Sequence, residues 1–322
     1  MRAIQVQAYG GPEVLTPTEL PSPEPGEGEV LVDLALTGVN FAETYQRTGY
    51  YPVPLPFVPG AEGAGTVSAV GPGVDTVRTG DRVASVDIRG AYAEQALVDA
   101  ARVVPIPDSI TEETAAAVML QGLTAHYLVF DSYRVRPNDV VLVHAAAGGM
   151  GLLLTQLATR LGARVIGTVS TPDKEALARQ AGAAEVIRYT ESDVVEEVKR
   201  ITGGAGVAAV YDGVGKDTFE SSLASLGLRA TLVLYGASSG AVPPFDPQRL
   251  QAAGSVFLTR PTLRHHIVAR SVLEARSADV FGWLADGSLS IRIHHRYPLE
   301  HARRAHEDLQ GRRTTGKLLL VP

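Results

Sequence analysis

The chain has 322 residues, a formal net charge of −6 and no cysteine. Without cysteine it offers no disulfide, no catalytic thiolate and no sulfur ligand for zinc. Its acidic balance gives no basic field for a nucleic-acid backbone, and no apolar run is long enough to cross a bilayer. Because Met1–Val6 starts a strand and not a signal peptide, we expect a cytoplasmic protein without membrane or nucleic-acid partners.

The first third of the chain reads as short strands separated by glycine and proline turns. The expected strands include Val30–Leu36, Gly65–Val70 and Asp81–Val86, with a turn at Gly71-Pro72-Gly73. Short strands at this spacing are typical of an all-β unit.

From about Asn138 onward the pattern changes to alternating strands and helices. Val140–His144 is a continuous apolar run, as expected of a strand buried on both faces of a parallel sheet, and Gly149–Leu161 repeats apolar residues at helical spacing. The expected elements that follow are strand Arg164–Val169, helix Pro172–Ala181, strand Glu185–Tyr189, helix Asp193–Ile201, strand Val207–Tyr211, helix Thr218–Leu226, strand Ala230–Tyr235 and a closing strand near Val256–Thr259. This alternation predicts the α/β class, with a doubly wound parallel sheet.

The end of the chain leaves this alternation. Helix Leu299–Leu309 and strand Lys317–Val321 are expected to return to the first domain, which would then be split in sequence. The predicted division is a mainly β domain from residues 1–122 and 262–322, and a doubly wound α/β domain from residues 123–261.

A glycine-rich turn lies between the first predicted parallel strand and its helix. In Ala145-Ala146-Ala147-Gly148-Gly149-Met150-Gly151, the dinucleotide fingerprint places Ala146, Gly148 and Gly151 at its glycine positions. Gly148 would let the backbone approach a pyrophosphate, and the helix N-terminus would offer N–H groups to that anion. The turn therefore predicts a dinucleotide cofactor.

The end of the next strand distinguishes the two nicotinamide cofactors. NAD enzymes place an acidic residue there to bind the ribose 2′-hydroxyl, whereas this chain has Thr168-Val169-Ser170-Thr171 and no carboxylate before Asp173. Groups that could bind a 2′-phosphate are Ser170, Thr171, Lys174 and Tyr189. The pattern favours NADP(H) over NAD.

Several motifs together carry a resemblance to a known family. They are Gly38–Gly49, Gly60–Gly65, Gln121–Ala125, Ala145–Gly151, Tyr211–Gly215, Thr259–Pro261 and Gly316-Lys317. Over essentially its whole length the chain resembles the medium-chain dehydrogenase/reductase superfamily, in its zeta-crystallin-like quinone oxidoreductase branch. The resemblance implies a GroES-like catalytic domain joined to a Rossmann domain.

The resemblance also implies that this chain works without a metal. The zinc alcohol dehydrogenases of the superfamily have Cys where Asn40 stands, His where Ala61 stands and a further Cys within Gln121–Ala125. Only Glu62 remains, and one carboxylate does not make a zinc site. The histidine pairs 265–266 and 294–295 have poor chelating geometry, as do His301 and His306, and we expect the histidines at the surface.

Asn40, Tyr45 and Arg47 are the catalytic candidates, which would donate hydrogen bonds to the acceptor oxygen, and the resemblance implies that Asn40 and Tyr45 border the nicotinamide. The expected cofactor-binding residues are Asn40, Tyr45, Thr124, Tyr127, Ala147, Gly148, Gly149, Met150, Gly151, Ser170, Thr171, Lys174, Tyr189, Val214, Gly236, Ser238, Ser239, Arg260 and Pro261.

The function expected from these features is NADPH-dependent reduction of a quinone by direct hydride transfer. One alternative is an NADPH-dependent enone or alkenal double-bond reductase, because the acceptor loops do not separate the two. A second alternative is a non-enzymatic NADPH-binding protein, crystallin-like or RNA-binding. Relatives in this branch dimerise, so a homodimer through the Rossmann edge strand near Val256–Thr259 is also expected.

Overall fold

The computed structural model describes all residues from 1 to 322, which form two compact units. Unit 1 comprises Met1–Leu123 and Ile267–Pro322, and unit 2 comprises Thr124–His266. The sequence predicts boundaries after residues 122 and 261. The second changeover falls later because helix α8 (Leu263–His266) belongs to unit 2, where His266 stacks on Tyr127.

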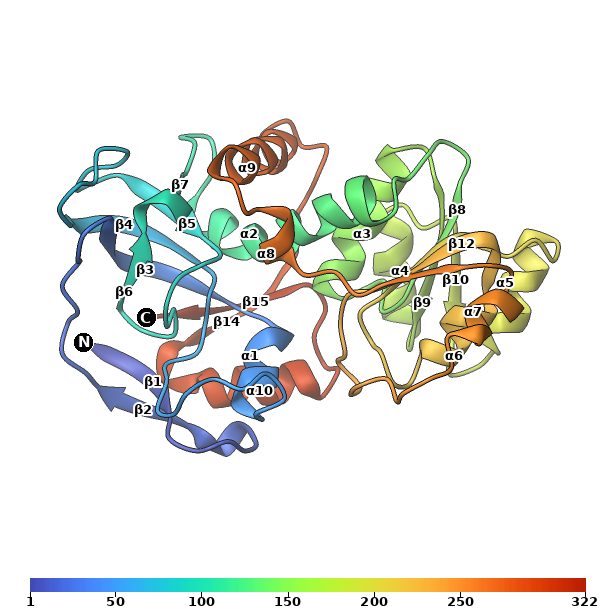
Figure 1. Ribbon diagram of the computed structural model, residues 1–322, viewed down its shortest axis with the longest axis horizontal. Coiled ribbons are helices and arrows are strands. Elements are labelled where there is room, and N and C mark those ends of the chain that lie inside the picture. The colour runs from blue at the N-terminus through green and yellow to red at the C-terminus, as the bar shows by residue number, and fades with distance from the viewer. The chain divides into compact units, whose positions relative to one another are not determined.

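Unit 2 is built on a six-stranded sheet with the strand order β10-β9-β8-β11-β12-β13. Figure 1 labels four of these strands, β8, β9, β10 and β12. Every neighbouring pair in the sheet is parallel. The strands are β8 (Val140–Val143), β9 (Arg164–Val169), β10 (Glu185–Arg188), β11 (Val207–Asp212), β12 (Leu226–Leu234) and β13 (Phe257–Thr259). This order is that of a doubly wound sheet, as the alternation in the sequence predicts.

Helices connect these strands and cover the sheet. They are α3 (Gly149–Arg160), α4 (Pro172–Gln180), α5 (Val194–Thr202), α6 (Phe219–Ala224), α7 (Gln248–Ala252) and α8, with a short π-helix η3 (Leu128–Ser132). Helices α3 and α4 pack on each other and on β9, whereas α5 packs on α6, which contacts β11 and β12. Leu142 and Val210 from the sheet are buried against Val198 of α5 and Phe219 of α6.

The order in which successive strands are added to the sheet reverses between β8 and β11. From β8 the strands run outward to β9 and β10, and from β11 they run the other way to β12 and β13. In open parallel sheets the carboxyl ends of the strands at this reversal form the usual ligand-binding edge. The glycine-rich turn follows β8, so it lies at this edge.

Unit 1 contains two sheets and supplies a separate core. The larger has the order β14-β15-β3-β4-β5-β7, with β6 also pairing β3, and the smaller is the β1-β2 pair. The strands are β1 (Arg2–Val6), β2 (Leu15–Glu19), β3 (Glu29–Val39), β4 (Gly63–Val70), β5 (Arg82–Ser85), β6 (Gln95–Asp99), β7 (Val104–Pro105), β14 (Ile293–Pro298) and β15 (Lys317–Val321). Val30, Val67 and Val98 are fully buried within the larger sheet's core.

The helices of unit 1 are α1 (Phe41–Arg47), α2 (Glu112–Tyr127, which crosses into unit 2), α9 (Arg270–Ala285) and α10 (Ala302–Gln310), with short 3-10 helices η1 (Pro12–Val14), η2 (Ala100–Arg102) and η4 (Leu299–His301). The single helix expected over residues 299–309 is therefore divided into η4 and α10. None of the helices has the length and apolar character needed to span a bilayer.

The returning tail places β15 beside β3. Leu318 pairs with Val39, while Thr37 on the same strand pairs with Gly63 of β4 on its other side. The central strand β3 is therefore flanked by the start of β15 and the start of β4 (Figure 1). This register brings Lys317, the first residue of β15, and Glu62, which directly precedes β4, close to Gly38.

Candidate active site

The glycine turn of unit 2 is shaped for close approach of the backbone to a ligand. Gly148 is the N-cap of α3, and no side chain caps this helix end. A Cβ at Gly151 would lie 2.3 Å from the Ala145 oxygen, so only glycine lets the helix pack against the turn. Ala145 has a φ of 51°, in the left-handed region that alanine rarely adopts. Backbone strain of this kind is concentrated at ligand sites.

The groups expected to bind a 2′-phosphate come together at the ends of β9 and β10. The Tyr189 N–H donates to Val169 O at 3.1 Å, and the Thr190 hydroxyl donates to Ser170 O at 3.1 Å. The Thr171 hydroxyl caps α4 by accepting from the Lys174 N–H at 3.3 Å. Ser170, Thr171, Lys174 and Tyr189 therefore share one edge of the sheet.

A buried polar network, which the sequence reasoning missed, joins the ends of three strands. Asp212, at the end of β11, is fully buried and accepts from the Val214 and Gly215 N–H groups at 2.8 and 3.0 Å. It also accepts from the hydroxyls of Thr218 (2.8 Å) and Ser222 (2.7 Å). The network fixes the loop that carries Val214.

His144 extends this network to β9. Its Nε2 lies 3.0 Å from the Ser222 hydroxyl and its Nδ1 lies 3.0 Å from the Thr168 hydroxyl. Since Ser222 already donates to Asp212, it accepts from Nε2–H, and Thr168 donates to Nδ1. Burial lowers the pKa of His144, in keeping with this neutral ring. In the sequence, the sign of this network was Asp212, an acidic residue at the end of an apolar strand.

The other predicted cofactor residues of unit 2 lie on its loops and on helix α2. The Ser239 hydroxyl donates to Val214 O at 2.8 Å, and an Arg260 Nη1–H donates to Leu234 O at 3.1 Å. Thr124 is buried in α2, as is Tyr127, whose ring is 4.1 Å from that of His266, centroid to centroid. Gly236 and Ser238 lie between β12 and Ser239, and Pro261 follows Arg260.

In unit 1, Asn40 belongs to a buried hydrogen-bonded cluster. Its Oδ1 accepts from Lys317 Nζ at 2.6 Å, and its Nδ2 donates to Glu62 Oε2 at 3.0 Å. Lys317 also forms an ion pair with Glu62, and both of these side chains have no exposed surface. The other Glu62 oxygen accepts from the Leu120 N–H at 2.6 Å. The sequence motifs include Glu62 and Lys317 but give no indication that they meet.

Glu43 is a second buried carboxyl group beside this cluster. Its Oε2 accepts from the Asn40 N–H at 2.7 Å and closes the first turn of α1. Burial raises the pKa of Glu43 to about 7, although the Lys317 ammonium acts in the opposite direction. Glu43 is therefore a carboxyl group that changes protonation near neutral pH.

Tyr45 lies in a group of aromatic rings that includes Tyr50 and Tyr51. Its ring centroid is 5.5 Å from that of Tyr50 and 5.2 Å from that of Tyr51, both edge to face. Tyr50 and Tyr51 stack on each other at 5.1 Å and are 46% and 41% exposed. Exposed tyrosine faces offer a surface on which a planar molecule can stack.

Arg47, one of the three predicted catalytic residues, is held in the interior by protein groups. It is 1% exposed, and its Nη1 lies 3.0 Å from Nδ1 of His306. Its other donors reach Gly10 O at 3.1 Å and Gln310 Oε1 at 3.0 Å. These contacts give Arg47 a structural role, so we do not include it among the residues that polarise the acceptor.

His306 corrects the expectation that the histidines lie at the surface, because it is fully buried. Its Nδ1 must accept from Arg47, which only donates, so Nε2 carries the proton and donates to the Tyr92 hydroxyl at 3.0 Å. Burial, aided by the Arg47 charge, lowers the pKa of His306 to about 3. The ring is a neutral link between α1 and α10.

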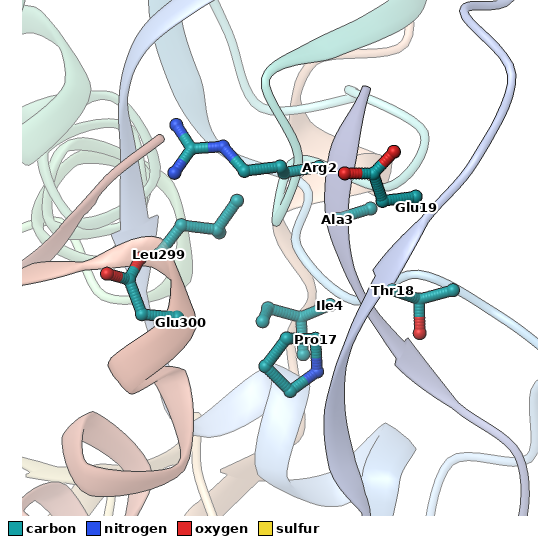
Figure 2. Close-up of a pocket in the computed structure, with 8 residues that line it drawn as sticks. All are labelled: Arg2, Ala3, Ile4, Pro17, Thr18, Glu19, Leu299 and Glu300. Carbon is teal, nitrogen blue, oxygen red and sulfur yellow. The ribbon is translucent and has the colours of Figure 1, made fainter.

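A pocket of about 350 Å³ opens in unit 1 between β1, β2 and η4 (Figure 2). Arg2 and Ile4 of β1 line it together with Leu299 and Glu300 of η4. The Arg2 side chain is engaged by Glu94, at 2.7 Å from Nε to Oε1. None of the residues predicted for catalysis or cofactor binding lines this pocket.

These features of the fold and the site define a class of protein. A doubly wound sheet with a dinucleotide turn, joined to a β-rich unit with a buried polar cluster, is the architecture of a nicotinamide-dependent dehydrogenase or reductase. Two family models match the chain, the alcohol dehydrogenase GroES-like domain over residues 26–108 and the zinc-binding dehydrogenase over residues 149–280.

The comparisons with individual proteins narrow the class. The chain is 45% identical over 323 residues to a quinone oxidoreductase of Pseudomonas aeruginosa, covering 100% of this chain and 99% of that protein. A 2-haloacrylate reductase of a Burkholderia species is 39% identical over 329 residues, covering 99% and 98%. A mycobacterial structure in complex with NADPH matches with a TM-score of 0.98 at 51% identity, covering 100% of both chains. The chain belongs to the quinone oxidoreductase family of the medium-chain dehydrogenase/reductase superfamily.

The residues present do not fit the zinc ion named in the second family model. The positions that the resemblance assigns to zinc ligands hold Asn40 and Ala61, and the ammonium group of Lys317 lies on both Asn40 and Glu62. A fixed positive charge on the remaining carboxylate opposes a divalent cation. No group of three or more histidine, cysteine, aspartate or glutamate side chains is placed to share a metal ion.

Proposed function

We propose that the protein reduces quinones with NADPH. The observation that carries this proposal is the Asn40 carboxamide, whose orientation is determined by Lys317 and Glu62 and which retains one Nδ2–H. Support also comes from the family, in which the Pseudomonas relative is a quinone oxidoreductase and the mycobacterial structure holds NADPH.

The residues of unit 2 fit this cofactor. Ala147–Gly151 would hold the pyrophosphate, because the uncapped start of α3 presents N–H groups and Gly151 keeps the turn tight. Ser170, Thr171, Lys174 and Tyr189 would hold the 2′-phosphate. The remaining predicted contacts with the cofactor are Asn40, Tyr45, Thr124, Tyr127, Val214, Gly236, Ser238, Ser239, Arg260 and Pro261.

When bound, NADPH supplies a hydride to the acceptor. The protein contributes position and charge: the free Nδ2–H of Asn40 would donate to the acceptor oxygen on which negative charge develops. The tyrosine rings at positions 45, 50 and 51 would stack a planar acceptor. The oxygen then takes up a proton from the Tyr45 hydroxyl or from water.

The test is turnover by wild type and by two variants with a series of quinones. Asn40→Ala is expected to lower kcat by about 100-fold, the usual effect of removing one oxyanion donor. Tyr45→Phe, which keeps the ring, is expected to lower kcat while preserving KM for the quinone. Wild-type turnover in Asn40→Ala would show that Asn40 has no part in the reaction.

A second candidate activity is reduction of a carbon–carbon double bond conjugated to a carbonyl. The Burkholderia relative at 39% identity is a 2-haloacrylate reductase, which favours this alternative. Both reactions need a donor to the carbonyl oxygen, so the same residues would serve. The kcat/KM values for 1,4-benzoquinone, 9,10-phenanthrenequinone and a simple enone, measured side by side, rank the two activities.

We also propose that two copies associate through strand β13, the edge of the unit 2 sheet. The edge is apolar and unpaired on one side, with Phe257 58% exposed and Leu228, near the start of β12, 86% exposed. Light scattering should give the mass of a dimer for wild type, and Phe257→Glu should shift it toward the monomer. A monomeric wild type would exclude this association.

The cytoplasmic location expected from the sequence stays a prediction.

A further inference from the structure

Lys317 is an unusual residue to find without exposed surface, and its charge is used entirely inside unit 1. Its ammonium contacts Asn40 Oδ1 at 2.6 Å and forms an ion pair with Glu62. A buried ion pair is costly to desolvate and contributes little net stability. Because the Lys317–Glu62 ion pair adds little stability, its contacts with Asn40 point to a role in function.

The two charges select one orientation of the Asn40 carboxamide. An ammonium group only donates and a carboxylate only accepts, so Oδ1 must face Lys317 and Nδ2 must face Glu62. Turning the amide over would oppose like groups at both contacts. One Nδ2–H remains after Glu62 is satisfied, and the ammonium on Oδ1 polarises the amide so that this hydrogen is a stronger donor.

The surroundings of the pair are built to keep it in place. The Leu120 N–H holds the other oxygen of Glu62 at 2.6 Å. A Cβ at Gly38 would lie 2.0 Å from Glu62 Oε2 and 2.9 Å from Lys317 Nζ, so glycine is needed on the strand between them. The register of β4 and β15 beside β3, the Leu120 N–H and the lack of a side chain at Gly38 thus all maintain the Glu62–Lys317 ion pair.

We propose that Lys317 is a positioning residue which, together with Glu62, orients and polarises the Asn40 amide toward the acceptor oxygen. The proposal rests on the proposed reduction of a carbonyl acceptor and deepens it. Lys317 itself does not touch the acceptor, and it acts through Asn40. Removing it should therefore lower kcat by the same route as removing the amide.

The experiment separates positioning from stability with a charge-balanced variant. Lys317→Met alone leaves Glu62 buried and unpaired, whereas Lys317→Met combined with Glu62→Gln removes both charges. We expect the double variant to regain most of the unfolding free energy that the single variant loses. Its kcat should nevertheless stay about 100-fold below wild type, as expected when a reacting group is misplaced, with KM for NADPH unchanged. Lys199→Met, on the exposed face of α5, is the matched control.

Adding Asn40→Ala to each background completes a mutant cycle. If Lys317 acts through Asn40, this substitution lowers kcat about 100-fold in wild type and by less than about threefold in the double variant. Equal effects in both backgrounds, or wild-type kcat in the double variant, would overturn the proposal.

A measurement without turnover keeps the inference separate from the proposed function. The side-chain NH₂ signals of Asn40 in a ¹⁵N spectrum are identified by their loss in Asn40→Ala. We expect two well-separated, slowly exchanging hydrogens in wild type and nearly equivalent, fast-exchanging ones in the double variant. Unchanged signals would refute positioning. If wild type reduces no carbonyl acceptor while these signals change as expected, the proposed function fails but the orientation of Asn40 by Lys317 stands.

Discussion

Glu62 and Lys317, which are 255 residues apart in the chain, form an ion pair with no exposed surface across strand β3. The pair is possible because β3 carries Gly38 between β4 and β15, where any side chain would collide with both charges. The ion pair links β15, in the returning tail of the chain, to the first part of unit 1. It also contacts Asn40, the residue that we propose polarises the acceptor.

Gly38→Ala tests this steric requirement. The added Cβ would force the Glu62 carboxylate and the Lys317 ammonium apart, and separating a buried pair costs about 3–5 kcal/mol. Urea unfolding should show a loss of that order. The control is Gly282→Ala in α9, where a Cβ has nothing within 4 Å, and the helix should gain up to about 1 kcal/mol. A Gly38→Ala protein as stable as wild type would contradict the account.

Lys174→Ala tests the choice of cofactor. Lys174 lies in the first turn of α4, at the sheet edge shared with Ser170 and Tyr189. A charged hydrogen bond to the 2′-phosphate contributes about 1.5–3 kcal/mol, so the Kd for NADPH should rise about 10-fold or more while that for NADH stays nearly constant. Fluorescence titration measures both constants, with Lys199→Ala as control. Equal effects on the two cofactors would exclude a role for Lys174 in selecting NADPH.

Asp212→Ala tests the network behind the cofactor loop. The substitution leaves the Val214 and Gly215 N–H groups and the Ser222 hydroxyl without their acceptor. Each buried unsatisfied group costs about 1–3 kcal/mol, so we expect a loss of at least about 3 kcal/mol together with weaker NADPH binding. Asp75→Ala, an exposed aspartate, should change stability by less than about 0.5 kcal/mol. Unaltered NADPH affinity in a destabilised Asp212→Ala protein would limit the network to folding.

His306 predicts a pH dependence of stability. The folded protein keeps this ring neutral down to a pKa of about 3, whereas the unfolded chain binds a proton below about pH 6.5. The unfolded state therefore takes up more protons as the pH falls, and His306 should lower stability by about 1.4 kcal/mol per pH unit between pH 6 and 4. Glu43 acts with the opposite sign between about pH 4.5 and 7, because its pKa is raised in the folded state.

The contribution of His306 is isolated by a difference measurement. The unfolding free energy of wild type minus that of His306→Gln should decline toward low pH, since Glu43 is common to both proteins. A difference for His306→Gln that is flat with pH would show that the buried ring is not kept neutral.

Local patterns predicted most of the fold of unit 2. The alternation after Asn138 identified each strand from β8 to β13, with the limits of β9 matching residue for residue and the others shifted by a few residues. The glycine turn was also found, because it depends on residues adjacent in sequence. Apolar periodicity and turn residues report the local environment, which is what determines these elements.

The missed features depend on contacts between distant segments. The Glu62–Lys317 pair requires the order and register of β4, β3 and β15, and a single lysine before an apolar run was its only local sign. In the same way, the sequence predicted Arg47 as a catalytic residue and His306 as a surface residue, and only the packing of α1 against α10 buries them together. Side-chain contacts of this kind depend on the topology of the fold, and the periodicity of apolar residues in the sequence gives no information about topology.

The most direct test of the central claim is the oxidation of NADPH by the purified protein with and without 1,4-benzoquinone. The account predicts that the reduced-cofactor absorbance falls only when the quinone is present, with one NADPH consumed per quinone reduced, and far more slowly with NADH. Tight binding of NADPH without any oxidation by a quinone or an enone would contradict it and would favour a protein that only binds the cofactor.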